Sequence, residues 1–237
     1  MPKLRRASRS ASANWTTIVT RGQPDRLELL TAARQIADFA STQGVPSLYA
    51  VRRSTYEHAG ALLADAVLQA GLNYRSVVMP RVGRILKEFP DADRVSALIC
   101  LVKKGSTAHL LDWQHPTKVE RFEHLVGFLH RAKVDTTEDI RTVLKSDTFC
   151  ANLQSLKGVG PKTIDYMSCL VGIESIAVDR HIRTFAARAG VNNDEYYFLK
   201  NTFCFAADLL SISRREFDAW VWSREARKQS PQLNFVF

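Results

Sequence analysis

The chain has 237 residues, with 33 lysines and arginines against 24 aspartates and glutamates, so its formal net charge at pH 7 is +9. Hydrophobic residues make up 46% of the chain and charged residues 24%, which is typical of a folded globular protein and excludes a wholly disordered chain. No apolar stretch approaches the ~20 residues of a membrane-spanning helix, so we expect no membrane partner. The positive balance favours a polyanionic partner.

The four cysteines, at positions 100, 150, 169 and 204, are widely spaced. They form no Cys-x-x-Cys pair and no clustered ligand set of the kind that binds zinc or an iron–sulfur centre. We therefore expect reduced thiols, no metal and no cofactor.

The N-terminal segment, residues 1–22, contains five lysines and arginines and no acidic residue. Residues 1–14 are rich in Ser, Ala and Arg and lack the apolar side chains needed for packing, which predicts that residues 1–22 form a flexible basic arm. Such an arm could follow a nucleic-acid backbone, direct the protein to an organelle, or remain a solvated tail. The sequence leaves these three alternatives open.

After the arm, the hydrophobic spacing predicts helices almost throughout and no strand. Residues 26–42 have apolar side chains close to a 3.6-residue period, and residues 57–71 form an unusually apolar helix that Gly71 ends. In residues 74–89, Pro80 either bends the helix or starts its main segment. Further helices are predicted for residues 118–132, 136–143, 147–156 and 180–188. The predicted fold class is therefore all-α.

The most informative segment, residues 156–166, reads Leu-Lys-Gly-Val-Gly-Pro-Lys-Thr-Ile-Asp-Tyr. Gly158 and Gly160 allow a tight turn, and Pro161 stands at the first position of the next helix, where proline is favoured. The turn leaves backbone N–H groups bare at the positive end of a helix dipole, which is a phosphate-binding arrangement. We therefore predict a helix-hairpin-helix over about residues 147–171, which grips a nucleic-acid backbone without reading its sequence. A tight turn without a ligand is the alternative.

A second motif follows at residues 176–182, which read Ile-Ala-Val-Asp-Arg-His-Ile. The apolar residues predict a buried approach, and Asp179 stands at the N-cap position of the helix that begins at Arg180. A helix N-terminus keeps a carboxylate ionised and oriented. Asp179 is therefore a candidate catalytic group, and a plain capping role is the alternative.

The hairpin, Lys162 and the Val-Asp-x-His-Ile motif together resemble the helix-hairpin-helix DNA glycosylase superfamily, and its endonuclease III-like branch most closely. The resemblance covers about residues 55–190. It implies a central helical barrel lobe over residues 55–176, a terminal lobe made of residues 23–54 and 177–237, and a catalytic cleft between the lobes. It also implies an intracellular, DNA-associated enzyme, expected as a monomer, whose partner is double-stranded DNA with a damaged, mismatched or modified base.

By resemblance, Asp179 is the catalytic aspartate and Lys162 is the nucleophile of a bifunctional enzyme. A fixed carboxylate stabilises the oxocarbenium-like transition state, and a neutral amine displaces the base, forms a Schiff base and cuts the strand by β-elimination (AP-lyase activity). The expected DNA-backbone contacts are Lys157, Gly158, Val159, Gly160, Thr163 and Arg180. Two alternatives remain. One is a monofunctional glycosylase in which Lys162 contacts only phosphate and Asp179 activates water, and the other is a non-catalytic DNA-binding module.

The base pocket, and the wedge that fills the gap left by a flipped base, are expected near residues 65–74 and in the loop 113–116. Asp65 either faces solvent as an ordinary surface charge or hydrogen-bonds within the pocket. The other candidates are polar or aromatic residues that could equally cap or pack: Gln69, Asn73, Tyr74, Gln114 and His115.

Three features depart from the family pattern. No cysteine follows Cys204, so the iron–sulfur cluster of many relatives is not expected, and the C-terminal segment is expected to pack through Phe217, Trp220 and Trp222. Gly71 stands where common relatives have a glutamine, so the wedge has to come from elsewhere. Asn73 and Tyr74 are not the usual residues after the early helix, so an oxidised pyrimidine is not implied as the substrate.

Overall fold

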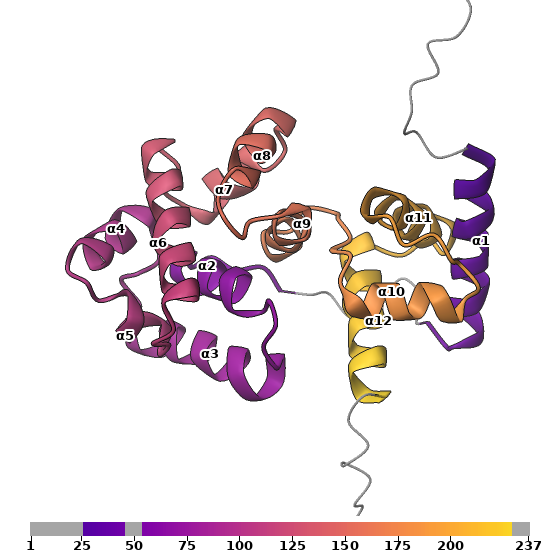
Figure 1. The fold of residues 1–237 in the computed structure, drawn as a ribbon, viewed down its shortest axis with the longest axis horizontal. Helices are drawn as coiled ribbons and strands as arrows, with labels where there is room; N and C mark the ends of the chain where they lie inside the picture. The colour runs from indigo at the N-terminus through magenta and orange to yellow at the C-terminus, as the bar shows by residue number, and fades with distance from the viewer. Residues whose placement is uncertain (1–25, 46–53, 229–237) are drawn as a thin grey trace, which may run out of the picture.

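The computed structural model describes residues 26–45 and 54–228, and within these ranges the chain forms helices and no β-strand (Figure 1). The predicted all-α fold class is confirmed. The basic arm predicted for residues 1–22 lies outside the described residues. None of the helices in the described ranges is long and apolar enough to cross a membrane.

A first group of helices surrounds one cluster of buried apolar side chains. Its elements are α2 (Ala59–Leu68), the π-helix η1 (Tyr74–Val78), α3 (Met79–Glu88), α4 (Val95–Lys103), α5 (Thr107–Leu111), α6 (Pro116–Arg131), α7 (Thr137–Val143), α8 (Asp147–Gln154) and α9 (Pro161–Leu170). Every residue of α2 is buried, because α3, α4, α6 and α9 all pack against this helix. Helix α2 is therefore the central element of the first cluster.

A second group encloses a separate apolar cluster and consists of α1 (Arg26–Thr42), α10 (Arg180–Arg188), α11 (Tyr196–Leu209) and α12 (Arg214–Lys228). Helix α1 packs along α11 although the two are far apart in the sequence, and α12 packs against α10 (Figure 1). Phe217 is fully buried in this cluster and Trp220 packs against it, as expected for the C-terminal segment. The division of the chain into two lobes at the predicted boundaries stays a prediction.

Helix α9 contributes to the first cluster but is also bonded to the second group. The buried carboxylate of Asp165 on α9 accepts hydrogen bonds from Ser175 (2.8 Å), Lys200 (2.6 Å) and Tyr196 (2.7 Å). Two of these donors, Tyr196 and Lys200, belong to α11. Near the end of α9, the Nε of Arg215 on α12 donates to the carbonyl oxygen of Cys169, at 2.8 Å. Polar bonds therefore hold α9 against α11 and α12.

The observed ends of α1 and α2 can be compared with the ends predicted from the sequence. Helix α1 spans residues 26–42, as predicted. Helix α2 is shorter than the predicted 57–71, because the side chain of His58 caps its N-terminus and the helix stops before Gly71. Gly71 has a φ of +81°, a left-handed conformation that glycine adopts without strain.

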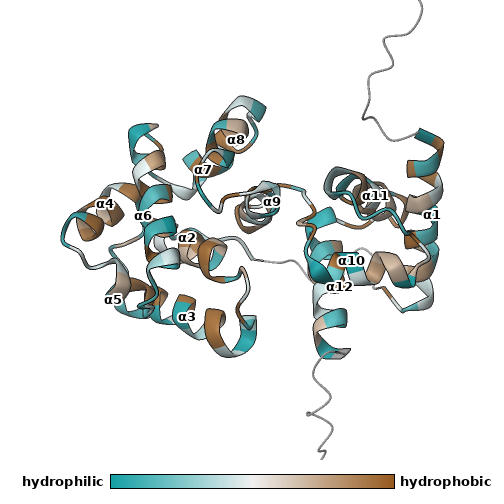
Figure 2. Cartoon of the chain, viewed as in Figure 1, coloured by the Kyte–Doolittle hydropathy of each residue, from teal (hydrophilic) through white to brown (hydrophobic). Residues whose placement is uncertain are grey.

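Pro80 lies in the first turn of α3, directly after η1, so it starts the main helix and does not bend it. Helix α3 has one apolar face, formed by Val82 and Ile85, and Figure 2 shows brown and teal segments along it. Four helices, α4, α5, α11 and α12, have no counterpart among the predicted ones. Helix α11 is rich in aromatic residues with modest helix propensity, so its packing along α1 stabilises it more than its local sequence does.

Candidate functional site

Lys162 lies in the first turn of α9, where its amine is half-buried. Its Nζ donates a hydrogen bond to Oε1 of Gln69, the C-cap residue of α2, and stands 5.7 Å from the centre of the Tyr166 ring. Burial lowers the pKa of Lys162 below its ordinary value, and Arg180 adds to the fall. The carboxylates that oppose this fall are Asp179, Asp218 and Asp65. The amine therefore loses its proton more readily than that of an exposed lysine.

Asp179 stands at the N-cap of α10, as predicted. Its Oδ1 accepts hydrogen bonds from the backbone N–H groups of His181, at 2.8 Å, and Ile182, at 3.0 Å. Its Oδ2 accepts no hydrogen bond from the described residues. One oxygen thus fixes the orientation of the carboxylate, and the other is available to a cation or a proton.

Asp218 of α12 supports the segment that leads to Asp179. Its Oδ1 accepts a hydrogen bond from the backbone N–H of Ala177, at 3.0 Å, and its side chain is buried. Its charge also opposes the fall in the pKa of Lys162. The sequence contains no signal for this role, because Asp218 lies beyond the segment that carries the family resemblance and its bond to Ala177 depends on tertiary packing.

Asp65 is completely buried on α2, so a solvent-facing role for this acid is wrong. Its Oδ2 accepts hydrogen bonds from the hydroxyl groups of Tyr56, at 2.8 Å, and Tyr74, at 3.1 Å. Its Oδ1 accepts one from the hydroxyl of Tyr166, at 2.9 Å. Three hydroxyl donors thus surround this carboxylate and replace the water that it loses on burial.

Aromatic side chains connect α12 to η1 and to the start of α10. The ring of Trp222 meets the ring of Tyr74 edge to face, with centres 5.5 Å apart, and the ring of His181 at 6.0 Å. Burial lowers the pKa of His181, and its Nδ1 has no hydrogen-bond partner in the described ranges. Trp222, expected only to pack the C-terminal segment, therefore contacts Tyr74, a predicted pocket residue.

The turn between α8 and α9 presents four backbone N–H groups, of Lys157, Gly158, Gly160 and Lys162, that have no acceptor among the described residues. Val159 and Thr163 were also predicted as DNA-backbone contacts. Their N–H groups donate to the carbonyl oxygens of Leu156 and Gly160, both at 3.0 Å, and both side chains are buried. Val159 thus anchors the turn in the first cluster, and the unbonded N–H groups belong to the residues on either side of it.

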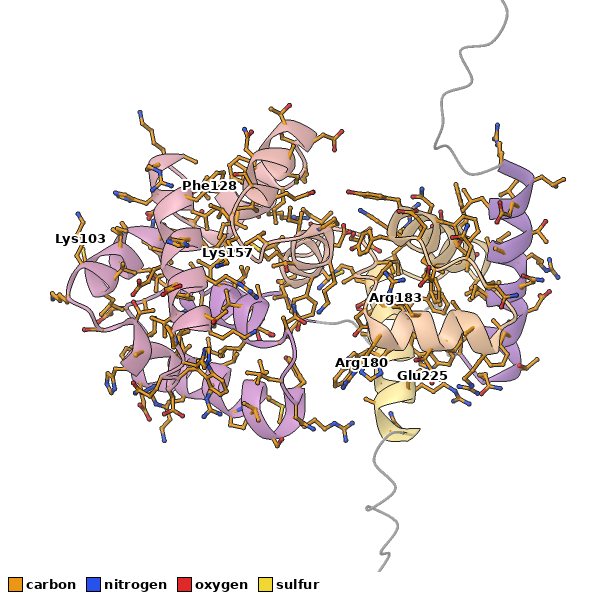
Figure 3. The ribbon with its side chains drawn as sticks, viewed as in Figure 1. Lys103, Phe128, Lys157, Arg180, Arg183 and Glu225 are labelled. Atoms are coloured by element: carbon orange, nitrogen blue, oxygen red, sulfur yellow. The ribbon has the colours of Figure 1, made fainter. Side chains whose placement is uncertain are left out.

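Lys157 and Arg180, two of the predicted backbone contacts, are exposed. Figure 3 shows them on either side of α9, Lys157 toward the first group of helices and Arg180 at the start of α10. The Nε of Arg180 also lies 3.4 Å from Nε2 of His181. Both positions leave the charged ends of these side chains open to an anionic partner.

Arg121 of α6 lies directly against the turn and was not predicted to be part of the site. Gly158 has a φ of +84°, and a Cβ atom at this position would overlap the guanidinium group of Arg121. Arg121 forms no hydrogen bond and no ion pair with the part of the chain that the structure describes. No local pattern indicates this contact, because α6 reaches the turn only through the tertiary fold.

Lys118, one turn before Arg121, joins the start of α6 to the end of α2. Its Nζ donates hydrogen bonds to the carbonyl oxygens of Val67, at 2.7 Å, and Ala70, at 2.6 Å. Burial lowers the pKa of Lys118 to about 8, and the charges of Arg121 and Lys162 contribute to this shift. The charges of Arg121 and Lys162 therefore both lie close enough to repel the charge of Lys118.

The remaining predicted pocket residues have local roles. Asn73 caps η1 by accepting a hydrogen bond from the N–H of Ser76, at 3.0 Å, and His115 caps α6 through Nδ1. Gln114 is exposed and forms no hydrogen bond with the described residues. The bonds of Lys118 place the loop of Gln114 and His115 beside the end of α2. No hydrogen bond or ring contact joins Asn73, Gln114 or His115 to Lys162.

The structure thus brings together Lys162, Gln69, Asp65, Tyr74 and Asp179 from the predicted site. Within the described ranges, no group of three or more His, Cys, Asp or Glu side chains is arranged to hold a metal ion, and the four cysteines form no disulfide. A comparison with protein-family models, with curated proteins and with solved structures finds no match to this chain, so its chemistry has to be argued from its own residues.

Proposed function

We propose that the chain is a DNA glycosylase with AP-lyase activity, which removes a damaged, mismatched or modified base from double-stranded DNA. One observation carries the proposal: the half-buried amine of Lys162, with its lowered pKa, interacts electrostatically with the carboxylate of Asp179, which caps α10. A lysine that only contacted phosphate would need neither burial nor the negative charges of three nearby carboxylates. The combination is that of a nucleophile with its charge partner.

The turn between α8 and α9 supplies the grip on the DNA backbone, as in a helix-hairpin-helix. The unbonded N–H groups of Gly158 and Gly160 stand at the N-terminus of α9, where the helix dipole favours a phosphate. Lys157, Arg180 and Arg121 add positive charge around these groups. Such contacts fix the position of the strand without reading its sequence.

The first chemical step exchanges the base for Lys162. The target nucleotide leaves the stack, because C1′ is out of reach in a stacked duplex. The lone pair of the neutral amine forms a bond to C1′ while the bond from C1′ to the base breaks, and the departing base takes up a proton. Oδ2 of Asp179 stabilises the positive charge on the sugar and accepts a proton from the lysine nitrogen.

The second step cuts the strand. The nitrogen lone pair opens the sugar ring by breaking the bond from C1′ to O4′, which takes the proton held by Asp179, and a protonated Schiff base remains. Loss of a proton from C2′ then breaks the bond from C3′ to its phosphate oxygen. Water hydrolyses the Schiff base and releases the amine of Lys162. The reaction consumes only water.

The two apolar clusters would form two lobes, with the base-binding cleft between them. Lys162 comes from a helix of the first cluster, and Asp179 begins a helix of the second. The rings of Tyr74 and Trp222 provide aromatic surface for stacking on a flipped base. We expect the protein to act as a monomer on DNA inside the cell.

A monofunctional glycosylase is the second candidate, and one observation favours it. Oδ2 of Asp179 has no donor among the described residues and is therefore able to orient a water molecule for attack on C1′. Lys162 would then contact a phosphate and form no covalent bond.

The test uses a panel of duplexes that carry uracil, a thymine mismatch, or oxidised, alkylated or methylated bases, with the released base identified by mass. Borohydride should trap a covalent adduct with the preferred duplex, and Lys162→Ala should abolish it. Lys103→Ala is the control, because Lys103 is exposed at the end of α4, far from α9 (Figure 3), and should leave trapping intact. Base release without an adduct would establish the monofunctional enzyme. If no duplex loses a base or is cut, the enzyme proposal fails.

A further inference from the structure

Asp65 is a buried acid that the proposed reaction does not use. It has no exposed surface, yet three tyrosine hydroxyls from three different segments converge on its two oxygens. Tyr56 precedes α2, Tyr74 begins η1, and Tyr166 belongs to α9. Burying a charge has a desolvation cost even when hydrogen bonds replace its water, so a buried acid with three tyrosine donors points to a role beyond packing.

The positions of the partners along the two helices connect Asp65 to Lys162. Asp65 and Gln69 are one turn apart on α2, and Lys162 and Tyr166 are one turn apart on α9. The helices therefore meet through two successive polar bonds, from Tyr166 to Asp65 and from Lys162 to Gln69. The Tyr166 ring that Asp65 holds is also the ring that lies 5.7 Å from the lysine amine.

We propose that Asp65 is a positioning residue for Lys162. Its hydrogen bond with the hydroxyl of Tyr166 fixes the aromatic ring that lies beside the amine, and its buried negative charge acts on that amine. This inference rests on the proposed function, in which Lys162 is the nucleophile. Asp65 itself does not touch the DNA, since tyrosine hydroxyls occupy both of its oxygens.

The sign of the charge effect follows from the groups that face Lys162. Its surroundings include one acid on α2, one cation on α6, three residues at the start of α10 and one acid on α12: Asp65, Lys118, Asp179, Arg180, His181 and Asp218. The negative charges favour the protonated amine. Asp65→Asn removes one of them and keeps an oxygen for the tyrosines, so the pKa of Lys162 should fall further. In Tyr166→Phe the charge stays, and the pKa should move less.

A direct titration tests the charge effect without relying on catalysis. The lysines of the full chain are reductively methylated with ¹³C, and the Lys162 signal is assigned by its loss in Lys162→Arg. We expect Lys162 to titrate at lower pH in Asp65→Asn than in the wild type, with a smaller shift in Tyr166→Phe. The same titration midpoint in wild type and folded Asp65→Asn would overturn the proposal.

A pair of tyrosine variants tests the positioning effect and does not depend on the folding of Asp65→Asn. Tyr166→Phe and Tyr56→Phe each remove one hydroxyl from the same carboxylate, but only Tyr166 lies beside the amine. At saturating DNA, Tyr166→Phe should slow borohydride trapping by about tenfold and Tyr56→Phe by much less, with DNA affinity unchanged in both. Equal losses would show that the carboxylate is only a structural anchor. If the wild type traps no DNA at all, the proposed function fails, and the titration still decides the charge effect.

Discussion

The guanidinium group of Arg121 lies against the backbone of Gly158, so helix α6 covers the turn that leads into α9. The contact is possible only because residue 158 has no side chain. Among the described residues, it places a cation with no hydrogen-bond or ion-pair partner beside the unbonded N–H groups of the same turn. One position thus combines a structural requirement for glycine with the arginine that we propose contacts DNA.

Gly158→Ala should destabilise the protein and weaken DNA binding. The left-handed φ of +84° costs a residue with a Cβ about 1–2 kcal/mol, and the guanidinium group of Arg121 has to move away from the added methyl group. Gly160→Ala is the matched control for stability, because Gly160 has a φ of −102° and open space around its Cβ position. Thermal unfolding should show a clear loss for the first variant only. An unchanged Tm for Gly158→Ala would contradict this account.

Arg121→Ala should weaken the binding of any duplex and reduce its salt dependence. If the guanidinium neutralises one phosphate, the slope of log affinity against log salt should become shallower by about 1. Fluorescence anisotropy over a range of salt concentrations measures this slope. Arg131→Ala, an exposed arginine at the other end of α6, is the control and should leave the slope unchanged. Equal slopes in Arg121→Ala and wild type would mean that Arg121 does not contact the DNA.

Asp179→Asn should separate the catalytic role of Asp179 from its capping role. Asparagine caps a helix about as well as aspartate, so the free energy of unfolding should change by less than about 0.5 kcal/mol, while base excision should be lost. Asp179→Ala should lose excision and also about 1 kcal/mol of stability. Urea unfolding and base release are measured on the same samples. Full excision by Asp179→Asn would rule out the catalytic role.

The lowered pKa of Lys118 predicts how the free energy of unfolding changes with pH. Its pKa is about 8 in the folded protein, and its ordinary value of 10.5 applies to the unfolded chain. Between these values the unfolded chain binds more protons, so the contribution of Lys118 to the free energy of unfolding rises as the pH rises through this window. Urea unfolding on both sides of the window should show this rise in the wild type and a smaller one in Lys118→Met. The exposed Lys103→Met should behave as the wild type does.

The parts of the fold and site that depend on neighbouring residues could be predicted from the sequence. Thr136 caps α7, Pro161 begins α9, and Asp179 caps α10, because each signal acts within one turn of helix. That Lys162 and Asp179 share one site was an expectation from the resemblance alone, and in the structure the charge of Asp179 acts on the Lys162 amine.

The contacts that complete the site could not be predicted in this way. Asp218 reaches Ala177 and Arg121 reaches Gly158 from helices that are remote in the sequence, and neither pair has a local signature. Asp65 was ambiguous, because an acid on an apolar helix is consistent with both exposure and burial. Only the packing of four helices around α2 shows that it is enclosed.

The bonds of Asp165 have a consequence for how the protein could accommodate DNA. Because Tyr196 and Lys200 hold α9 to α11, the helix that carries Lys162 is not free to swing away with the first cluster when a duplex enters. The separation between the amine of Lys162 and the carboxylate of Asp179 should then stay the same when other parts of the chain bend. In a complex with DNA, α9 and α10 should superpose on their present positions as one rigid body. Any change in helix positions should occur in the other helices.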